Sequence, residues 1–352
     1  YKALNTSNLD DPAIALPTDH FTTNIWTGSG ADNRTITTGF DPGLSWIKRR
    51  NGTNWHSLSD SVRAANPMPV LYSNDTSAEA TDANALAFVS NGYTVDDNNY
   101  YNASAGTYVG WTWKAGGAAS SNGDGTITSS VSANPTAGFS IATYTGNNTA
   151  QATIGHGLSQ RPDLVIIKDR ENSSTQWVHN PIGALGSNYY GYFTTGTFTA
   201  DSGNVFWYTP TSTVVKVSAH AEVNASSTDY VMYCFNSIKG YSKVGKYSSN
   251  NSVDGPFIYL GFTPAYILLK CINATDSWNI YDIKRNGYNG TGGTYQLRAD
   301  SAAAGFTAAA TMVDLVSNGM KIRTNDPGTN GSGRDYIFYA VASNPFKTAN
   351  AR

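Results

Sequence analysis

The sequence predicts an all-β protein of three tandem antiparallel β-sandwich modules of about 100 residues each, with few or no long helices. One observation is a repeat, since an apolar run in which a proline precedes a lysine by six residues occurs three times. Its copies are Asp41-Pro-Gly-Leu-Ser-Trp-Ile-Lys48, Arg161-Pro-Asp-Leu-Val-Ile-Ile-Lys168 and Thr263-Pro-Ala-Tyr-Ile-Leu-Leu-Lys270. A second observation is composition, because only 14% of the residues are charged and Thr, Ser, Asn and Gly separate short apolar runs. Such a mixture favours strands and turns.

Each copy of the repeat carries further matching positions. A tryptophan follows each lysine after a polar turn, and each copy closes with an apolar strand that begins at a tyrosine. We expect a structural role, in which the lysine ends a buried strand and reaches water while the tryptophan packs in the core. The alternative is a ligand site used three times, with an ammonium beside an aromatic face. The repeated residues are Pro42, Lys48, Trp55 and Tyr108, then Pro162, Lys168, Trp177 and Tyr230, then Pro264, Lys270, Trp278 and Tyr336.

Taken in order, the chain divides into five segments. Residues 1–25 contain two prolines and no periodicity, so we expect an extended arm that packs on a neighbouring surface or a poorly ordered terminus. The three β modules are assigned to residues 26–119, 138–243 and 244–352. Between the first two lies a Gly/Ser/Ala-rich stretch, residues 120–137, whose low complexity predicts a flexible linker or an extended crossover.

Within the first module, short apolar segments alternate with turn residues. This spacing, broken by Gly, Asn, Asp and Pro, points to an antiparallel sandwich or a small barrel. Asp60-Ser-Val-Arg-Ala-Ala65 is compatible with one helical turn. The expected strands are 34–38, 43–50, 54–60, 69–73, 85–90, 92–96 and 107–114.

Charge and cysteine content exclude several classes of protein. The net charge is −2 and there is no block of Lys or Arg, which argues against binding of nucleic acid or of an anionic membrane surface. No run of 18 apolar residues exists, so we expect no membrane insertion. Cys234 and Cys271 stand outside any metal-ligand spacing and are expected to be free thiols.

No catalytic constellation is evident. The sequence has no Gly-x-Ser-x-Gly, and its five histidines fall at unrelated places in the repeat. Acidic residues such as Asp96, Asp97, Glu171, Glu222 and Asp229 show no spacing that forces two carboxylates into one cleft. We therefore expect no enzyme, no metal site and no cofactor.

The three copies differ most in loops that are rich in Tyr, Asn and Gly. Tyrosine offers a flat face and a hydroxyl, and asparagine both donates and accepts hydrogen bonds, which suits neutral, hydroxyl-rich partners such as glycans. The same composition also serves ordinary solvent-exposed β-turns. The candidate receptor or glycan-binding residues are Tyr100, Tyr101, Asn102, Tyr189, Tyr190, Tyr192, Tyr288 and Asn289.

Several longer phrases, taken in series, carry a family resemblance that spans essentially the whole chain. They resemble a family of tail-fibre-like virion proteins of tailed bacteriophages, especially those of marine bacteria and cyanobacteria. The most specific phrases are Ala3-Leu-Asn-Thr-Ser-Asn-Leu9, Trp46-Ile-Lys-Arg-Arg50, Trp113-Lys-Ala-Gly-Gly117, Gly138-Phe-Ser-Ile-Ala-Thr-Tyr-Thr-Gly146 and Pro345-Phe-Lys-Thr-Ala-Asn-Ala-Arg352.

The resemblance implies a structural protein at the virion surface, assembled in the host cytoplasm. It implies a tail fibre or receptor-binding protein that adheres to a host cell-surface glycan or outer-membrane receptor. It further implies a homo-oligomer, a trimer, with other tail or capsid proteins as partners. A head-fibre or capsid decoration protein without a receptor is the first alternative, and a polysaccharide depolymerase is the second.

Overall fold

The computed structural model describes residues 8–82, 85–286 and 293–349. The all-β prediction is confirmed, since strands dominate and every helix in these ranges is a single turn. None of the described helices has the length and apolar character needed to cross a bilayer. The helices are α1 (Ile182–Leu185), α2 (Ala221–Asn224), α3 (Ile283–Asn286) and α4 (Pro327–Asn330), with 3-10 turns η2 (Pro17–Asp19) and η3 (Phe346–Thr348).

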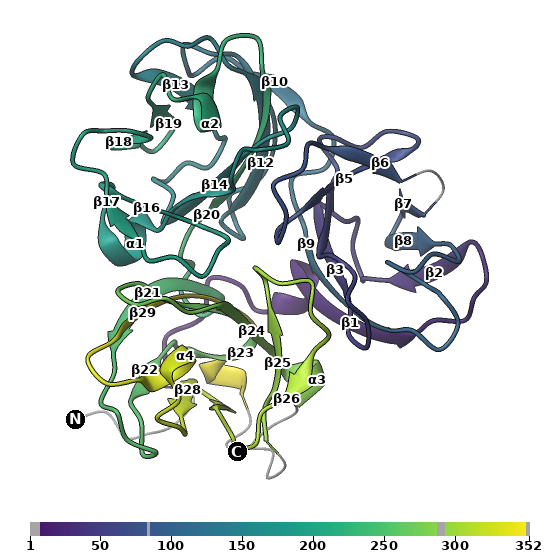
Figure 1. Cartoon of the computed structure of the whole chain (residues 1–352), viewed down its shortest axis with the longest axis vertical. Helices are drawn as coiled ribbons and strands as arrows, with labels where there is room; N and C mark the ends of the chain where they lie inside the picture. Colours follow the sequence, from purple (N-terminus) through teal and green to yellow (C-terminus); the bar gives the residue numbers. More distant parts are fainter. Residues whose placement is uncertain (1–7, 83–84, 287–292, 350–352) are drawn as a thin grey trace.

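The strands form three lobes, each with one large and one three-stranded sheet (Figure 1). The first lobe, residues 21–113, has a six-stranded sheet β1-β9-β3-β4-β5-β6 and a small sheet β2-β8-β7. All seven strands expected here are present, whereas β1 and β6 were not anticipated. The strands are β1 (Phe21–Thr27), β2 (Arg34–Thr37), β3 (Leu44–Arg49), β4 (Ser57–Asp60), β5 (Met68–Tyr72), β6 (Ala80–Asp82), β7 (Leu86–Val89), β8 (Gly92–Val95) and β9 (Thr107–Trp113).

The second lobe, residues 120–235, has an eight-stranded sheet β10-β11-β12-β20-β14-β15-β16-β17 and a small sheet β13-β19-β18. The strands are β10 (Ser120–Asn122), β11 (Ser129–Asn134), β12 (Phe139–Thr145), β13 (Ala152–Gly155), β14 (Leu164–Asp169), β15 (Val178–Asn180), β16 (Tyr189–Tyr192), β17 (Thr199–Ala200), β18 (Trp207–Tyr208), β19 (Val214–Val217) and β20 (Asp229–Phe235).

The third lobe, residues 242–345, repeats the order of the first, with sheets β21-β29-β23-β24-β25-β26 and β22-β28-β27. In every large sheet the strand that carries the repeat lysine pairs antiparallel with the closing strand of its lobe. The strands are β21 (Ser242–Ser248), β22 (Phe257–Tyr259), β23 (Phe262–Cys271), β24 (Trp278–Asp282), β25 (Tyr295–Arg298), β26 (Phe306–Thr307), β27 (Val313–Val316), β28 (Gly319–Ile322) and β29 (Asp335–Pro345).

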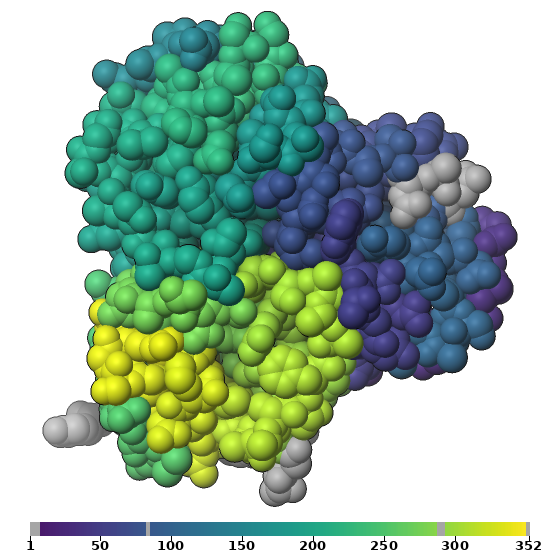
Figure 2. Space-filling model, in the orientation of Figure 1, coloured from purple at the N-terminus to yellow at the C-terminus, as the bar shows by residue number. Residues whose placement is uncertain are grey.

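The lobes meet at their large sheets and share one hydrophobic core. Figure 2 shows the three lobes in contact around the middle of one face. The lobes therefore pack around one another and do not stand in a row. Because their cores are joined, the division into three independent modules stays an interpretation of the repeats. Aromatic pairs cross each junction, with ring centroids 5.6 Å apart for Trp46 and Phe193, 5.4 Å for Trp113 and Tyr266, and 4.8 Å for Phe235 and Tyr339.

The predicted linker is folded. Residues 120–137 contain β10 and β11, and β11 pairs with β12 along its whole length. Val131 is buried among the apolar residues of the second lobe. The prediction of a flexible linker is thus wrong, because small polar side chains do not prevent a backbone from joining an existing sheet.

The amino-terminal arm lies against the connection between the second and third lobes. Ala13 N donates to Lys239 O (3.2 Å), and Ile14 is buried in the shared core. The predicted boundary at residue 25 is wrong, because β1 already begins at Phe21 and pairs with β9. The arm that the structure describes is therefore residues 8–20. Both cysteines are free and buried, as expected.

Candidate functional site

The repeat lysines lie at the junctions between lobes. Each is fully buried, and its Nζ donates to a backbone carbonyl of its own turn as well as to one in a neighbouring lobe. The lysine of the first lobe thus bonds to the third lobe, that of the third to the second, and that of the second to the first, so the three hydrogen bonds form a closed ring of contacts. The prediction that these lysines reach water is wrong, because the neighbouring lobe covers each ammonium. The carbonyls across the junctions are Ala302 O for Lys48 (3.1 Å), Thr76 O for Lys168 (3.3 Å) and Thr195 O for Lys270 (3.1 Å).

Burial makes these amines weak bases. It lowers the pKa of Lys48 to about 7, with the charge of Arg49 as a further cause. The pKa of Lys168 and that of Lys270 fall to about 8, again chiefly through burial. Protein carbonyls already surround each Nζ, so a ligand site used three times does not fit this geometry. The lysines instead hold the lobes to one another.

The tryptophan after each lysine has the expected structural role in two lobes only. Trp177 Nε1 donates to Tyr72 O (2.8 Å) and Trp278 Nε1 donates to Tyr192 O (2.7 Å), both across a junction. In the first lobe Ile47 faces Ser57, so the residue opposite Lys48 is His56. Trp55 therefore lies one position away.

His56, and not Trp55, takes the tryptophan's place in the first lobe. Its buried ring accepts a hydrogen bond from Trp46 Nε1 (2.9 Å), and burial holds its pKa well below the ordinary value. Trp55 is only half-buried. The prediction that Trp55 packs in the core is wrong, because the strand register moves it off the buried face.

The three closing tyrosines are structural, as predicted. Each is fully buried and stacks on an aromatic residue of the paired strand. Each hydroxyl accepts from a backbone N–H five residues upstream and donates to a carbonyl nine residues upstream. For Tyr108, Tyr230 and Tyr336 the donors are Ala103, Ala225 and Gly331, and the acceptors are Asn99, Ala221 and Pro327. The repeat prolines Pro42, Pro162 and Pro264 are also buried.

Two of the candidate glycan-binding residues are inaccessible. Tyr101 is 1% exposed and Asn102 is 0% exposed. The Asn102 side chain donates to Ala31 O (2.7 Å) and accepts from Ser29 N (3.1 Å), so it fastens its loop to the β1–β2 connection. The prediction is wrong for these two residues, because their hydrogen-bonding capacity and surface are consumed inside the lobe.

The remaining candidates are dispersed. Tyr100 is half-buried in the first lobe. Tyr189, Tyr190 and Tyr192 lie half-buried on β16 of the second lobe, where the Tyr190 and Tyr192 rings are 5.7 Å apart. Their part in binding stays a prediction. Tyr288 and Asn289 lie outside the described residues.

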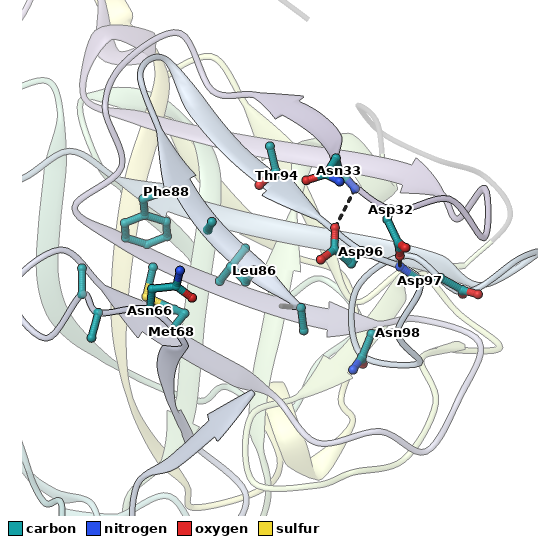
Figure 3. A pocket seen from close by; sticks show the side chains of 14 residues that line it. Asp32, Asn33, Asn66, Met68, Leu86, Phe88, Thr94, Asp96, Asp97 and Asn98 are labelled. Carbon is teal, nitrogen blue, oxygen red and sulfur yellow. Dashed lines mark hydrogen bonds between the residues drawn. The ribbon is translucent and has the colours of Figure 1, made fainter. Parts of the chain in front are cut away.

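The first lobe contains a pocket of about 730 Å³ next to the loop that carries Tyr100 (Figure 3). Its apolar lining includes buried Met68 and Leu86 and half-buried Phe88. The small sheet supplies Leu86 and Phe88, while Met68 comes from the start of β5. The polar lining consists of Asp32, Asn33, Asn66, Thr94, Asp96, Asp97 and Asn98.

Two loops are fastened together at the polar edge of this pocket. Asn33 N donates to Asp96 Oδ1 (2.6 Å), and Asp97 N donates to Asp32 Oδ1 (3.0 Å), as Figure 3 shows. No Lys, Arg or His is among the lining residues, so the pocket is acidic. Across the part of the chain that the structure describes, no cluster of three metal-ligating side chains occurs. The pocket can accept hydrogen bonds from hydroxyl groups and can contact an apolar ring face.

The sequence marks only one edge of this pocket. Asp96 and Asp97 are acidic residues of a loop rich in Tyr and Asn, and that composition is what predicts glycan binding. The opposite edge, Asp32 and Asn33, is more than 60 residues away along the chain, and no local pattern marks it.

Comparison with known proteins gives a family. Residues 16–345 match the model of a family described as Domain of unknown function (DUF7483), which covers all three lobes. Comparison with curated proteins and comparison with solved structures each returned no match. These comparisons assign no ligand to the pocket.

Proposed function

This chain belongs to the DUF7483 family, and we propose that it is a virion-surface adhesin of a tailed phage, a tail-fibre protein that binds a glycan on the host cell. The observation that carries the proposal is the acidic, apolar-lined pocket beside the loop of Asp96, Asp97 and Asn98. The resemblance to tail-fibre-like virion proteins supports the same reading. An outer-membrane receptor would have to present comparable hydroxyl-rich chemistry.

The pocket suits a sugar for two physical reasons. A pyranose ring has an apolar face of C–H groups, which Phe88 can contact. Its hydroxyl groups can donate hydrogen bonds to the carboxylate and amide oxygens of the pocket. The edge loops are tied by hydrogen bonds from backbone N–H groups to the Asp96 and Asp32 carboxylates, so little order has to be gained on binding. Three carboxylates would repel uronic acids or phosphate, which makes a neutral or amino-substituted glycan the expected ligand.

The proposal includes a trimeric fibre that contacts other tail or capsid proteins. Three chains would present three pockets, and weak sites that act together raise avidity. The mass in solution tests this part. A trimer of the 37.6 kDa chain is expected, and a monomer at micromolar concentration would contradict it.

The test of adhesion is binding of the purified chain to intact host cells, with soluble surface polysaccharide as competitor. We expect saturable binding that the polysaccharide displaces. Phe88→Ala should weaken it about tenfold. Val89→Ala is the matched control, since Val89 is exposed on the same strand and its side chain does not line the pocket.

Other results identify the alternatives. No binding by the folded chain would indicate a head-fibre or capsid decoration protein. Loss of polymer during incubation would indicate a depolymerase, and the carboxylates Asp32, Asp96 and Asp97 would then be the residues to substitute.

A further inference from the structure

The threefold arrangement allows equivalent positions in the lobes to be compared. Opposite the repeat lysine lie His56, Trp177 and Trp278, as the strand registers show. The residue just before this position is Trp55 in the first lobe, Gln176 in the second and Ser277 in the third. A tryptophan here is therefore peculiar to the first lobe.

A second set of equivalent positions lies on the next strand of each large sheet (β5, β16 and β25), where the pairing register defines it. Ser57 faces Tyr72 in the first lobe, Val178 faces Tyr192 in the second, and Asn279 faces Arg298 in the third. The equivalent residues are therefore Tyr72, Tyr192 and Arg298.

A third set follows from the closing tyrosines. Their hydroxyls donate to the carbonyls of Asn99, Ala221 and Pro327. The next residues along the chain are Tyr100, Glu222 and Gly328.

These three positions converge in space. In the first lobe the ring centroids of Trp55 and Tyr72 are 4.9 Å apart, and those of Tyr72 and Tyr100 are 5.9 Å apart. In the second lobe Gln176 N donates to Glu222 Oε1 (3.2 Å). Burial and the neighbouring Glu222 carboxylate also raise the pKa of Tyr192.

The first lobe alone has an aromatic residue at all three converging positions. The second lobe folds with Gln176 and Glu222 at two of them, and the third folds with Ser277, Arg298 and Gly328. An aromatic triad is therefore not a requirement of this fold. All three residues are half-buried, so part of the cluster remains accessible to solvent.

We propose that Trp55, Tyr72 and Tyr100 form an aromatic cradle that binds the apolar face of hexopyranose rings in a neutral oligosaccharide. This inference rests on the proposed function and adds a second binding site to the first lobe, because none of the three residues lines the pocket in Figure 3. The Trp55 and Tyr72 rings meet edge to face at 64°, and the Tyr72 and Tyr100 rings are tilted by 40°, so the cluster offers ring faces in different directions and not one flat platform. Next to Tyr100 in the chain, Asn99 accepts from Arg49 Nη1 (2.9 Å), and this exposed pair supplies polar groups beside the cluster.

The size of the cradle favours a sugar over a protein partner. Stable protein interfaces bury about 1,200–2,000 Å² in total. Three aromatic side chains supply about 150–250 Å² each even when completely covered, and these three are already half-buried. A net charge of −2 without a basic block also argues against a nucleic acid stacked on the rings.

The test uses the full chain and two defined probes, maltohexaose and cellohexaose, titrated by calorimetry. Trp55→Gln installs the residue that the second lobe has at this position, so the thermal midpoint should change by no more than about 2 °C. We expect the wild-type chain to bind at least one hexaose, and the variant to bind it about tenfold more weakly. Phe257→Thr is the matched control, because Phe257 is an exposed aromatic of the third lobe whose equivalent in the first lobe is Thr35.

Each other outcome is decisive. Equal hexaose affinity in Trp55→Gln and the wild type refutes the cradle, and an effect of Phe88→Ala on cell binding would leave the adhesin proposal intact. If the wild-type chain binds cells but neither hexaose, the cradle is not a site for neutral hexoses.

If the wild-type chain binds neither cells nor hexaoses, both proposals are wrong. An equal loss in Phe257→Thr would show that the effect is not specific to the cradle.

Discussion

At the scale of single residues, His179 is the least satisfied buried group in the described chain. It is fully buried, and neither ring nitrogen has a hydrogen-bond partner. Its ring packs against Phe193 and Trp278, with centroids 4.1 and 4.9 Å away. Burial lowers its pKa to about 3. An imidazole is thus kept neutral inside an aromatic cluster at the junction of two lobes.

We expect His179→Leu to reduce the sensitivity of the fold to acid. Below pH 6.5 the unfolded state binds a proton that the folded state binds only near pH 3, so His179 makes stability fall as pH drops between these values. The free energy of unfolding of the variant minus that of the wild type should be about 2–3 kcal/mol more positive near pH 4.5 than at pH 7. Urea unfolding at the two pH values measures it. A difference between variant and wild type that does not change with pH would contradict the account.

We expect Lys168→Met to destabilise the fold although it makes the site more apolar. Lys168 Nζ donates to Thr76 O, Asp169 O and Thr175 Oγ1, and the substitution removes all three hydrogen bonds, one of them to a lobe across the junction. The expected loss is about 2–4 kcal/mol in the free energy of unfolding. Lys246→Met, on an exposed position of β21, is the control and should cost little. Equal losses in the two variants would show that Lys168 does not hold the junction.

At the scale of elements, the small sheet of the first lobe depends on a glycine. A Cβ at Gly92 would collide with the carbonyl oxygen of Ile36 on the paired strand β2. Gly319 meets Ile258 in the same way in the third lobe. Both glycines allow close approach of two backbones at the start of a strand.

We expect Gly92→Ala to destabilise the protein by about 1–3 kcal/mol and to weaken the cell binding that the proposed function predicts. Both effects follow because β8 pairs with β7, which carries Phe88 of the pocket. Gly123→Ala is the control, since nothing lies within 4 Å of the added Cβ. Thermal unfolding and the cell-binding assay measure the two effects. Unchanged stability in Gly92→Ala would mean that β2 can shift without cost.

Most strands of the first lobe follow from local pattern, whereas the predicted linker between the first two lobes failed for a tertiary reason. Short apolar runs bounded by Asn, Gly, Asp or Pro fold as strands. The Ser-rich β10 and β11 lack such a run, and only pairing with β12 makes them part of a sheet.

At the scale of the whole molecule, the shared core predicts cooperative unfolding. Trp46, Phe193 and Tyr266 come from different lobes and belong to one hydrophobic cluster. The lysine ring joins the same lobes through hydrogen bonds.

We therefore expect a single thermal transition, with equal calorimetric and van't Hoff enthalpies. Phe235→Ala, which removes the contact of the second lobe with Tyr339 of the third, should lower the midpoint of that one transition. Two or three separate transitions would show instead that the lobes unfold as independent modules.

The candidate site was predictable only in part. The loop with Asp96, Asp97 and Tyr100 was marked by its composition. That Asn102 is buried, and that Asp32 forms the opposite edge of the pocket, depends on how the loop folds over distant residues.

The sequence by itself determined the all-β class, the repeat and the buried tyrosines, because alternation and turn residues act over a few positions. Only the tertiary structure decided that the lysines are buried and that His56 replaces Trp55. It also decided that three lobes close around one core. These features depend on strand register and on contacts between residues 75 to 254 positions apart, which no short-range pattern encodes.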